Sequence, residues 1–295
     1  MIWSRREVLQ LAAALTAGGT VERMRTRPIP RTGEPLPVIG MGTWRTFDVG
    51  EQDDRKPLRE VLRTLFDAGG RLIDSSPMYG RAEQVVGELL GAEPRPFLAT
   101  KVWTSGREQG IEQMRRSIRR MWPVAQGRPF DLIQIHNLLD WRTHLPTLRA
   151  WKEAGTLRYW GITHYSPSAF DEMEQILRAD KPDFVQLPYS VAVRDAEKRL
   201  LPACAEAGAA VLVMRPFEGG SLFRDALRQP LPSWAAEIDC ASWAQIFLKF
   251  ILGHPAVTCP IPATKNPAHM ADDAHAGFGR LPDPAMRQRI VQQLT

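Results

Sequence analysis

Strand-like and helix-like segments alternate eight times along this chain, and the alternation limits the fold more than any other feature. Short runs of branched and aromatic residues are each followed by apolar residues at helical spacing. The predicted strands are 36–44, 72–73, 97–103, 130–136, 157–163, 184–187, 209–214 and 257–261. The predicted helices are 58–68, 85–90, 111–121, 145–154, 168–178, 197–207, 242–252 and 284–294.

This pattern predicts an α/β fold, specifically one parallel (β/α)8 barrel (a TIM barrel) wrapped by helices. An open doubly wound sheet is the alternative, and it needs Gly-x-Gly-x-x-Gly after its first strand. The stretch 40–44, Gly-Met-Gly-Thr-Trp, lacks the third glycine. A chain of 295 residues, 44% of them hydrophobic, can bury one large core. We expect a single barrel domain over residues 24–295.

The first 23 residues read as a leader that precedes the barrel. Arg5 and Arg6 stand before a modestly apolar run at 8–19, which is too short to span a bilayer. The segment resembles a twin-arginine export signal, a route that carries folded proteins. That resemblance implies a periplasmic protein, with no membrane contact beyond the export machinery. The alternative is a short amphipathic helix on a cytoplasmic protein.

Most of the positive charge lies at this same end. The whole chain carries +5, and residues 1–31 hold six arginines against two glutamates, a net of +4 that leaves +1 for the rest. A nearly neutral body offers no basic face for nucleic acid. The cysteines Cys204, Cys240 and Cys259 are odd in number and widely spaced. They therefore indicate neither a disulfide framework nor a metal site.

Polar side chains stand where consecutive predicted strands end. Asp74, Lys101 and His136 end three of them, and Tyr79 follows Asp74 by five residues. The carboxyl ends of barrel strands share one rim, where such folds place their chemistry. The spacings, 101 − 74 = 27 and 136 − 101 = 35, each fit one strand–helix–strand step. We expect the four to converge, with Lys101 pairing with Asp74 and lowering the pKa of Tyr79 below about 10.

Such a cluster suits proton transfer to a carbonyl oxygen. Tyr79 would give or take the proton near neutrality, and His136 would hold the oxygen against the phenol. Each residue also has an ordinary structural interpretation: Asp74 as a turn cap, Tyr79 as packing, Lys101 as a solvated strand end, His136 as a polar loop residue. The occurrence of all four at successive strand ends favours the catalytic interpretation.

The residues and the motifs around them resemble those of the aldo-keto reductase family. The resemblance covers nearly the whole chain after the leader, through 27–30, 33–37, 39–44, 73–80, 100–102 and 135–136. It implies that Asp74, Tyr79, Lys101 and His136 form the catalytic tetrad, with Tyr79 as proton donor. It also implies that NAD(P)H delivers hydride to a small aldehyde or ketone, which becomes an alcohol.

At the positions where the family binds its cofactor, this chain matches the usual residues less completely than at the tetrad. Thr163 and His164 replace a usual Ser-Asn pair, and Asp273 replaces a usual Asn near the adenine. Thr264, Lys265 and Arg215 could hold a 2′-phosphate, which favours NADP, with NAD as the alternative. The full set of expected cofactor residues is Gly42, Thr43, Trp44, Asp74, Thr163, His164, Gln186, Met214, Arg215, Thr264, Lys265, His269 and Asp273.

Aromatic and polar residues after the strands are candidates for the substrate pocket. Trp44, Trp103 and Asn137 are the principal ones, and the further candidates are Phe47, Trp141 and Phe217. Aromatics at such places also commonly cover the core. Two other functions stay open: a barrel lyase whose Lys101 forms a Schiff base, and a nucleotide-binding regulatory barrel with little turnover. The sequence identifies neither the physiological substrate nor the oligomeric state.

Overall fold

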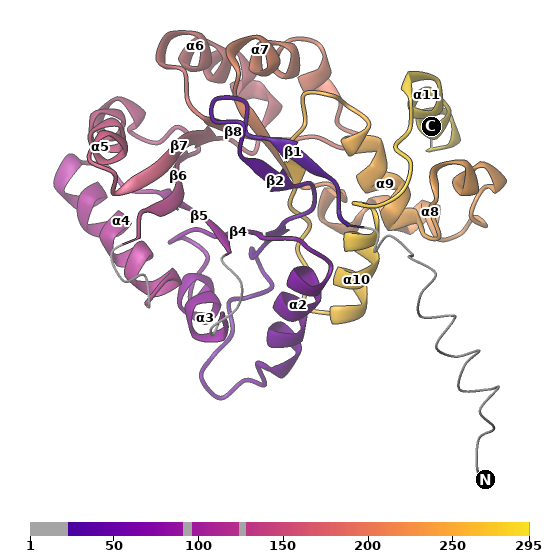
Figure 1. The fold of residues 1–295 in the computed structure, drawn as a ribbon, viewed down its shortest axis with the longest axis horizontal. Coiled ribbons are helices and arrows are strands. Elements are labelled where there is room, and N and C mark those ends of the chain that lie inside the picture. Colours follow the sequence, from indigo (N-terminus) through magenta and orange to yellow (C-terminus); the bar gives the residue numbers. More distant parts are fainter. Residues whose placement is uncertain (1–22, 91–95, 124–127, 295) are drawn as a thin grey trace, which may run out of the picture.

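The protein, analysed as a computed structural model, is described over residues 23–90, 96–123 and 128–294. The expected leader, residues 1–23, therefore lies outside the described residues except for Arg23. Figure 1 shows a central ring of strands surrounded by helices, with the hairpin of β1 and β2 across its centre. Within the described residues, no helix is long and apolar enough to cross a membrane.

Eight parallel strands form one sheet in the order β10-β9-β8-β7-β6-β5-β4-β3. Their bounds are β3 Met41–Gly42, β4 Leu72–Asp74, β5 Phe97–Val102, β6 Phe130–His136, β7 Leu157–Thr163, β8 Phe184–Pro188, β9 Ala210–Met214 and β10 Cys259–Pro260. Backbone hydrogen bonds also join the first strand to the last, from Gly40 N to Pro260 O (3.1 Å) and from Gly42 N to Pro262 O (2.9 Å). The predicted (β/α)8 barrel is confirmed.

Helices cover the outside of this barrel. Their bounds are α2 Lys56–Asp67, α3 Ala82–Leu89, α4 Arg107–Met121, α5 Trp141–Glu153, α6 Phe170–Asp180, α7 Leu200–Ala207, α8 Leu222–Ala226, α9 Trp243–Leu252, α10 Pro267–His275 and α11 Pro284–Leu294. Short 3-10 turns occupy Pro167–Ala169, Asp195–Glu197, Glu218–Gly220 and Ser233–Ile238. Helix α2 buries one stripe, made by Leu58, Val61, Leu62, Leu65 and Phe66. Helix α9, in contrast, is buried at every residue.

The predicted first strand, 36–44, is wrong as one element. Its beginning is β2 (Pro35–Pro37), which pairs antiparallel with β1 (Thr26–Pro28), and only 41–42 joins the barrel. The hairpin closes the amino-terminal end of the barrel, where Ile29 and Leu36 pack inside the ring of strands. Arg27 reinforces this position by donating a hydrogen bond to the carbonyl of His254 (2.9 Å).

Several helices differ from the sequence-based prediction: α4 and α5 each begin four residues before their predicted starts, and α8 and α10 were not predicted. Helix α5 begins at Trp141, four residues before the predicted start, and includes Pro146. Helix α10 was not predicted; Asn266 begins it by accepting a hydrogen bond from Ala268 N (3.0 Å). An apolar stripe is weak in the first turn of α5 and of α10, so hydrophobic periodicity does not mark where they begin.

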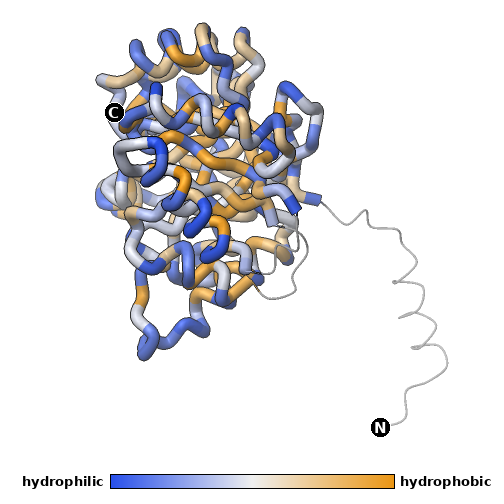
Figure 2. The backbone as a smooth tube through the Cα atoms, turned by 90° about the vertical axis from the view of Figure 1, so that its left-hand side faces the viewer, coloured by the Kyte–Doolittle hydropathy of each residue, from blue (hydrophilic) through white to orange (hydrophobic). Residues whose placement is uncertain are grey.

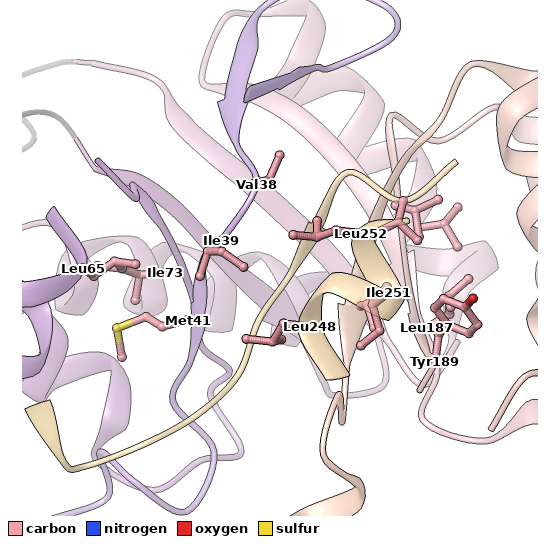
Figure 3. Packing of buried hydrophobic residues seen from close by; sticks show 14 of the residues in the cluster. Val38, Ile39, Met41, Leu65, Ile73, Leu187, Tyr189, Leu248, Ile251 and Leu252 are labelled. Carbon is pink, nitrogen blue, oxygen red and sulfur yellow. The ribbon is translucent and has the colours of Figure 1, made fainter. Parts of the chain in front are cut away.

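The core has two parts, one inside the barrel and one between strands and helices. Figure 3 shows the second part, where Ile39 and Met41 lie beside Ile73 and Leu65, and residues of α9 such as Leu248 cover the strands from another side. Along the chain, apolar segments run through the interior and hydrophilic ones form the outer turns (Figure 2). Burial of each such side chain contributes roughly 1.5–3 kcal/mol, which fixes the strands and hence the rim.

Candidate active site

An ion pair between Asp74 and Lys101 lies at the carboxyl end of the barrel strands. Lys101 Nζ donates to Asp74 Oδ2 at 2.5 Å and to the Ser75 carbonyl at 2.8 Å. The Lys101 side chain is fully buried, and that of Asp74 is 3% exposed. Burial opposes the charge of Lys101, but the surrounding acidic groups, Asp74 foremost, together outweigh it and raise the pKa of Lys101. Lys101 is therefore held as an ammonium ion.

The second oxygen of Asp74 is held by two amides. Gln134 Nε2 and Gln186 Nε2 each donate to Asp74 Oδ1 at 3.0 Å. Gln186 in turn accepts from Thr163 Oγ1 at 3.1 Å. Gln134 lies on β6, two strands from the strand of Asp74, and Gln186 lies on β8, four strands away, so the two amides fix the carboxylate from different sides of the barrel. A buried carboxylate with both oxygens engaged in this way is rigid.

Tyr79 lies over this ion pair from the loop between β4 and α3. Lys101 Nζ is 5.2 Å from the centroid of the Tyr79 ring, and the ring meets that of His136 edge-on at 5.9 Å. The predicted lowering of the Tyr79 pKa is wrong in its net direction. Burial raises the pKa of Tyr79 more than the Lys101 charge lowers it. The phenol therefore keeps its proton at neutral pH.

His136 completes the cluster as a neutral imidazole. Its Nδ1 is 3.0 Å from Ser76 Oγ, and Ser76 Oγ accepts the Met78 amide proton at 3.4 Å. Either atom can be the donor in this bond; when the Ser76 hydroxyl donates to Nδ1, the imidazole proton lies on Nε2. Burial, the Lys101 charge and then His164 lower the pKa of His136 to about 3. Such a ring can donate one hydrogen bond to a carbonyl oxygen.

Large apolar side chains surround this cluster at the rim. Trp44, Met78 and Trp103 are 47%, 39% and 40% exposed, and each follows one of the neighbouring strands β3, β4 and β5. The Trp103 ring lies 6.4 Å from that of His136. Asn137 has a left-handed backbone (φ 53°), and its buried Oδ1 has no hydrogen-bond partner among the described residues. Trp44, Trp103 and Asn137 thus lie just after the ends of their strands, and their role in a substrate pocket stays a prediction.

The three further pocket candidates do not share this arrangement. Phe47 is completely buried in the core. Phe217 packs against Phe223, with ring centroids 5.0 Å apart. Trp141 Nε1 donates to Glu172 Oε1 at 3.2 Å, while the guanidinium of Arg142 covers its ring at 4.4 Å. Each of these aromatic rings is already engaged by its own surroundings.

The expected nicotinamide residues lie on the strands next to His136. In the sheet register, His136 is opposite Thr163, and Thr163 is opposite Gln186. His164 follows directly, and its Nδ1 accepts the Ser166 amide proton at 3.0 Å. Because a backbone amide can only donate, His164 carries its own proton on Nε2. Thr43 anchors the start of the site by donating to the Asp74 carbonyl at 3.0 Å.

The remaining cofactor candidates lie after β9 and β10. Gly42, the last residue of β3, lies close against the segment after β10, since a Cβ on it would come 3.1 Å from the Ile261 carbonyl. Lys265 and His269 are exposed. Thr264 is buried and accepts the Asn266 amide proton at 3.0 Å.

Three of these candidates are already paired, packed or buried. Arg215 forms an ion pair with Glu218 at 3.3 Å, which uses part of its charge. Met214 packs on the apolar interior of the barrel. Asp273 is 3% exposed, and burial raises its pKa well above the usual value. Lys265 is therefore the freest cation of the expected set.

Sequence reasoning missed several polar residues that build this site. Gln134 holds Asp74, Ser76 orients His136, and Glu83 lies buried behind the rim. A signal for Gln134 was available, because it shares a strand face with His136 two residues on. Ser76 carried no such signal, since Ser-Ser-Pro reads as an ordinary turn.

Comparison with known proteins gives consistent results. The model of the aldo/keto reductase family matches residues 38–289. The chain is 27% identical over 199 residues to aldo-keto reductase YhdN of Bacillus subtilis, covering 61% of this chain and 58% of that protein's length. It is 26% identical over 242 residues to the NADH-specific methylglyoxal reductase of Escherichia coli, covering 72% and 73%.

A solved structure is similar over almost the whole barrel. It is the aldo-keto reductase of Klebsiella pneumoniae in complex with NADPH, 25% identical, with a TM-score of 0.73. The similarity covers 93% of this chain and 95% of that one.

Proposed function

This chain belongs to the aldo/keto reductase family, and from that premise we propose that it reduces an aldehyde or ketone to an alcohol with NADPH. The observation that carries the proposal is the contact of Asp74, Lys101, Tyr79 and His136 at one rim. A bound reduced nicotinamide supplies the hydride, that is, one proton and two electrons, to the carbonyl carbon. The protein supplies the proton for the carbonyl oxygen and positions the substrate and the cofactor relative to each other.

Tyr79 is the proton donor in this proposal. Its raised pKa keeps the phenol protonated at neutral pH. The Lys101 ammonium ion beside it stabilises the phenolate that is left when the proton moves to the substrate oxygen. His136 donates from Nε2 to the same oxygen, which fixes the carbonyl for attack. Asp74 keeps Lys101 charged and in place.

The residues available for the cofactor fit a nicotinamide dinucleotide. His164 offers an N–H at the rim, one residue beyond the strand partner of His136. For a 2′-phosphate, Lys265 is exposed and has no carboxylate partner within the described part of the chain. This supports NADPH over NADH, although Arg215 contributes less than expected because of Glu218. Relatives differ on this point, since one is named NADH-specific and another was solved with NADPH.

The rim also supports a substrate with an apolar body. Trp44, Met78 and Trp103 expose large apolar surfaces beside His136, and such surfaces bind apolar or aromatic groups. We therefore extend the proposal to aromatic or otherwise apolar carbonyl compounds. Residues 1–23 resemble an export signal, and on that basis we also propose a periplasmic location.

The Schiff-base alternative has less support. Such chemistry needs a neutral amine that can reach the substrate, whereas Lys101 is fully buried, paired with Asp74 and held as an ammonium ion. A regulatory barrel would bind nucleotide without turnover, and nothing in the geometry of the four residues favours it over catalysis.

Titration with NADPH and NADH, followed by a panel of aromatic and aliphatic carbonyl compounds, tests the proposal. We expect tighter binding of NADPH and faster reduction of the aromatic compounds. Tight nucleotide binding without reduction of any compound would favour the regulatory barrel. Covalent trapping of a substrate on Lys101 by borohydride would favour the lyase.

A further inference from the structure

A second buried carboxyl group lies behind the tetrad and takes no part in the proposed chemistry. Glu83, in the first turn of α3, is 1% exposed. Its Oε1 accepts the Thr100 hydroxyl at 2.5 Å and its Oε2 accepts the Ser117 hydroxyl at 3.0 Å. Within the described residues, no cation lies within ion-pair distance of it. Both carboxylate oxygens are therefore held by hydroxyl groups.

These two bonds join three elements that meet behind Tyr79. Thr100 directly precedes Lys101 on β5, and Ser117 lies in α4. The loop that carries Tyr79 runs straight into α3, with the Ala82 amide donating to the Tyr79 carbonyl at 3.1 Å. Glu83 directly follows Ala82 in the chain. It thus ties the end of the Tyr79 loop to the strand of Lys101.

The packing around α3 leaves this connection little freedom. Gly87 lies one turn after Glu83, on the same helix face. A Cβ at Gly87 would come within 1.9 Å of the Arg120 carbonyl, so α3 lies directly against α4. At the other end, Asp48 Oδ1 accepts the Arg81 amide proton at 3.0 Å. The Tyr79 loop is therefore held by Asp48 on one side and Glu83 on the other.

Stability alone does not favour a carboxyl group at this place. Burial raises the pKa of Glu83 more than the two hydroxyl hydrogen bonds and the more distant charges of Arg120 and Lys101 lower it, because a carboxylate without an ion-pair partner is costly in the interior. An apolar side chain of similar size often serves stability as well or better than a buried charge. What an apolar residue cannot do is hold two hydroxyl groups in a fixed direction.

We propose that Glu83 is a positioning residue for the reductase reaction, which fixes Tyr79 against Lys101 through Thr100 and Ser117. The inference rests on the proposed function, but its geometry does not depend on which carbonyl compound is reduced. A misplacement of about 1 Å at a reacting group can cost about 100-fold in rate. Glu83 acts at a distance, through the loop, and touches neither substrate nor cofactor.

The test compares Glu83→Ala, Glu83→Gln and the control Glu88→Ala. The Glu83→Gln variant would keep both contacts, since an amide accepts from one hydroxyl and donates to the other, whereas Glu83→Ala keeps neither. Glu88 is the same residue type in the same helix, but its side chain is 42% exposed. We expect Glu83→Ala to lower kcat by about 10- to 100-fold with unchanged NADPH affinity, and Glu83→Gln to recover most of it. Glu88→Ala should behave as wild type.

The solvent isotope effect separates positioning from simple loss of folded protein. A displaced Tyr79 slows the proton step, so the effect of D2O on kcat should grow in Glu83→Ala. Loss of folded enzyme would lower the rate without changing that effect, and would overturn the proposal. A Glu83→Gln rate as low as that of Glu83→Ala would overturn it too. If Glu83→Ala does not fold, Thr100→Val and Ser117→Ala take its place, and wild-type behaviour of both overturns the inference.

An optical titration makes the test independent of turnover. Tyr79 is one of four tyrosines, so its ionisation can be assigned by difference from Tyr79→Phe. Moving the phenol away from Lys101 removes the influence that lowers its pKa, so the pKa of Tyr79 should rise further in Glu83→Ala and not in Glu83→Gln. If the wild type reduces no carbonyl, the proposed function fails, yet this titration still decides whether Glu83 positions Tyr79. An unchanged pKa in Glu83→Ala would count against the inference.

Discussion

Asp74 Oδ2 and Lys101 Nζ are 2.5 Å apart, in a place where neither side chain is more than 3% exposed. The pair lies across two neighbouring strands, β4 and β5. Removing one member leaves the other charge buried without compensation, while removing both does not. This asymmetry allows the pair to be tested separately from catalysis.

The Lys101→Met variant should be destabilised by about 3–5 kcal/mol. The double variant Asp74→Asn with Lys101→Met should regain much of that loss, because no uncompensated charge remains. The free energy of unfolding in urea measures both. Equal stabilities for the single and double variants would show that the carboxylate has another counter-charge.

The Tyr79→Phe variant should lose about 100- to 10,000-fold in kcat, the range associated with removal of a positioned proton donor. NADPH affinity should not change, because the ring still packs edge-on against His136. Steady-state kinetics and fluorescence titration measure the two quantities. A residual rate near that of wild type would assign the proton to another group.

Reduction should be insensitive to pH through the neutral range. The pKa of Tyr79 is raised by burial, so the donor stays protonated until strongly alkaline pH and the rate falls only there. The pKa of His136 is lowered to about 3, so no step in the rate is expected near the usual histidine value of about 6.5. A plot of kcat against pH with an inflection near neutrality would contradict both assignments.

His136 should also make the protein less stable in mild acid. In the unfolded chain it takes up a proton below about pH 6.5, whereas in the folded protein its pKa is lowered to about 3. Between these two pH values the unfolded state therefore binds more protons than the folded state. The contribution of His136 to the loss of stability reaches about 2 kcal/mol at about pH 5. The variant His136→Gln should lose less stability than wild type over the same change in pH, as unfolding curves will show.

The position of the proton on His164 should determine how tightly the protein binds analogues of the cofactor. With Nδ1 occupied by the Ser166 amide, His164 can only donate, and so it can recognise the carbonyl but not the NH2 of a carboxamide. An NADPH analogue with an acetyl group in place of the carboxamide should bind wild type as tightly as NADPH. His164→Asn, which can also accept, should prefer NADPH by about 0.5–1.5 kcal/mol in binding free energy. Calorimetry of the four combinations is the measurement.

Removal of residues 1–23 should leave activity in vitro intact if the segment is only an export signal. Fused to a reporter that works only after export, the segment should direct it to the periplasm, and replacing Arg5 and Arg6 by lysine should stop this. Cytoplasmic retention of the unmodified fusion would contradict the proposed location.

The sequence was most informative where strands are buried on both faces. The bounds of β6 and β7 were predicted at the observed residues, because most of their residues are branched, aromatic or otherwise apolar, although Asp131, Gln134 and Arg158 interrupt the two runs. The convergence of Asp74, Lys101 and His136 followed from the shared rim of a parallel barrel. Periodicity and topology alone therefore placed three of the four site residues.

What the sequence could not supply depended on desolvation and on contacts between distant segments. Charge alone suggested a lowered pKa for Tyr79, but the degree of burial decides the direction and is known only from the packed structure. Glu83 lay outside the predicted helix 85–90, so nothing in the sequence indicated that its carboxyl group is buried. The hairpin was missed because Leu36 and Pro37 were assigned to one continuous strand, 36–44, and because β1 has no apolar run that would mark it as a strand.

That hairpin has a practical consequence. In the part of the chain that the structure describes, the hairpin closes the end of the barrel remote from Tyr79, so small molecules reach the reacting groups from the opposite end. A purification tag, a surface linker or a fused protein attached at the hairpin would leave the site accessible. The same group attached near Trp44 or Trp103 would hinder the entry of substrate and cofactor.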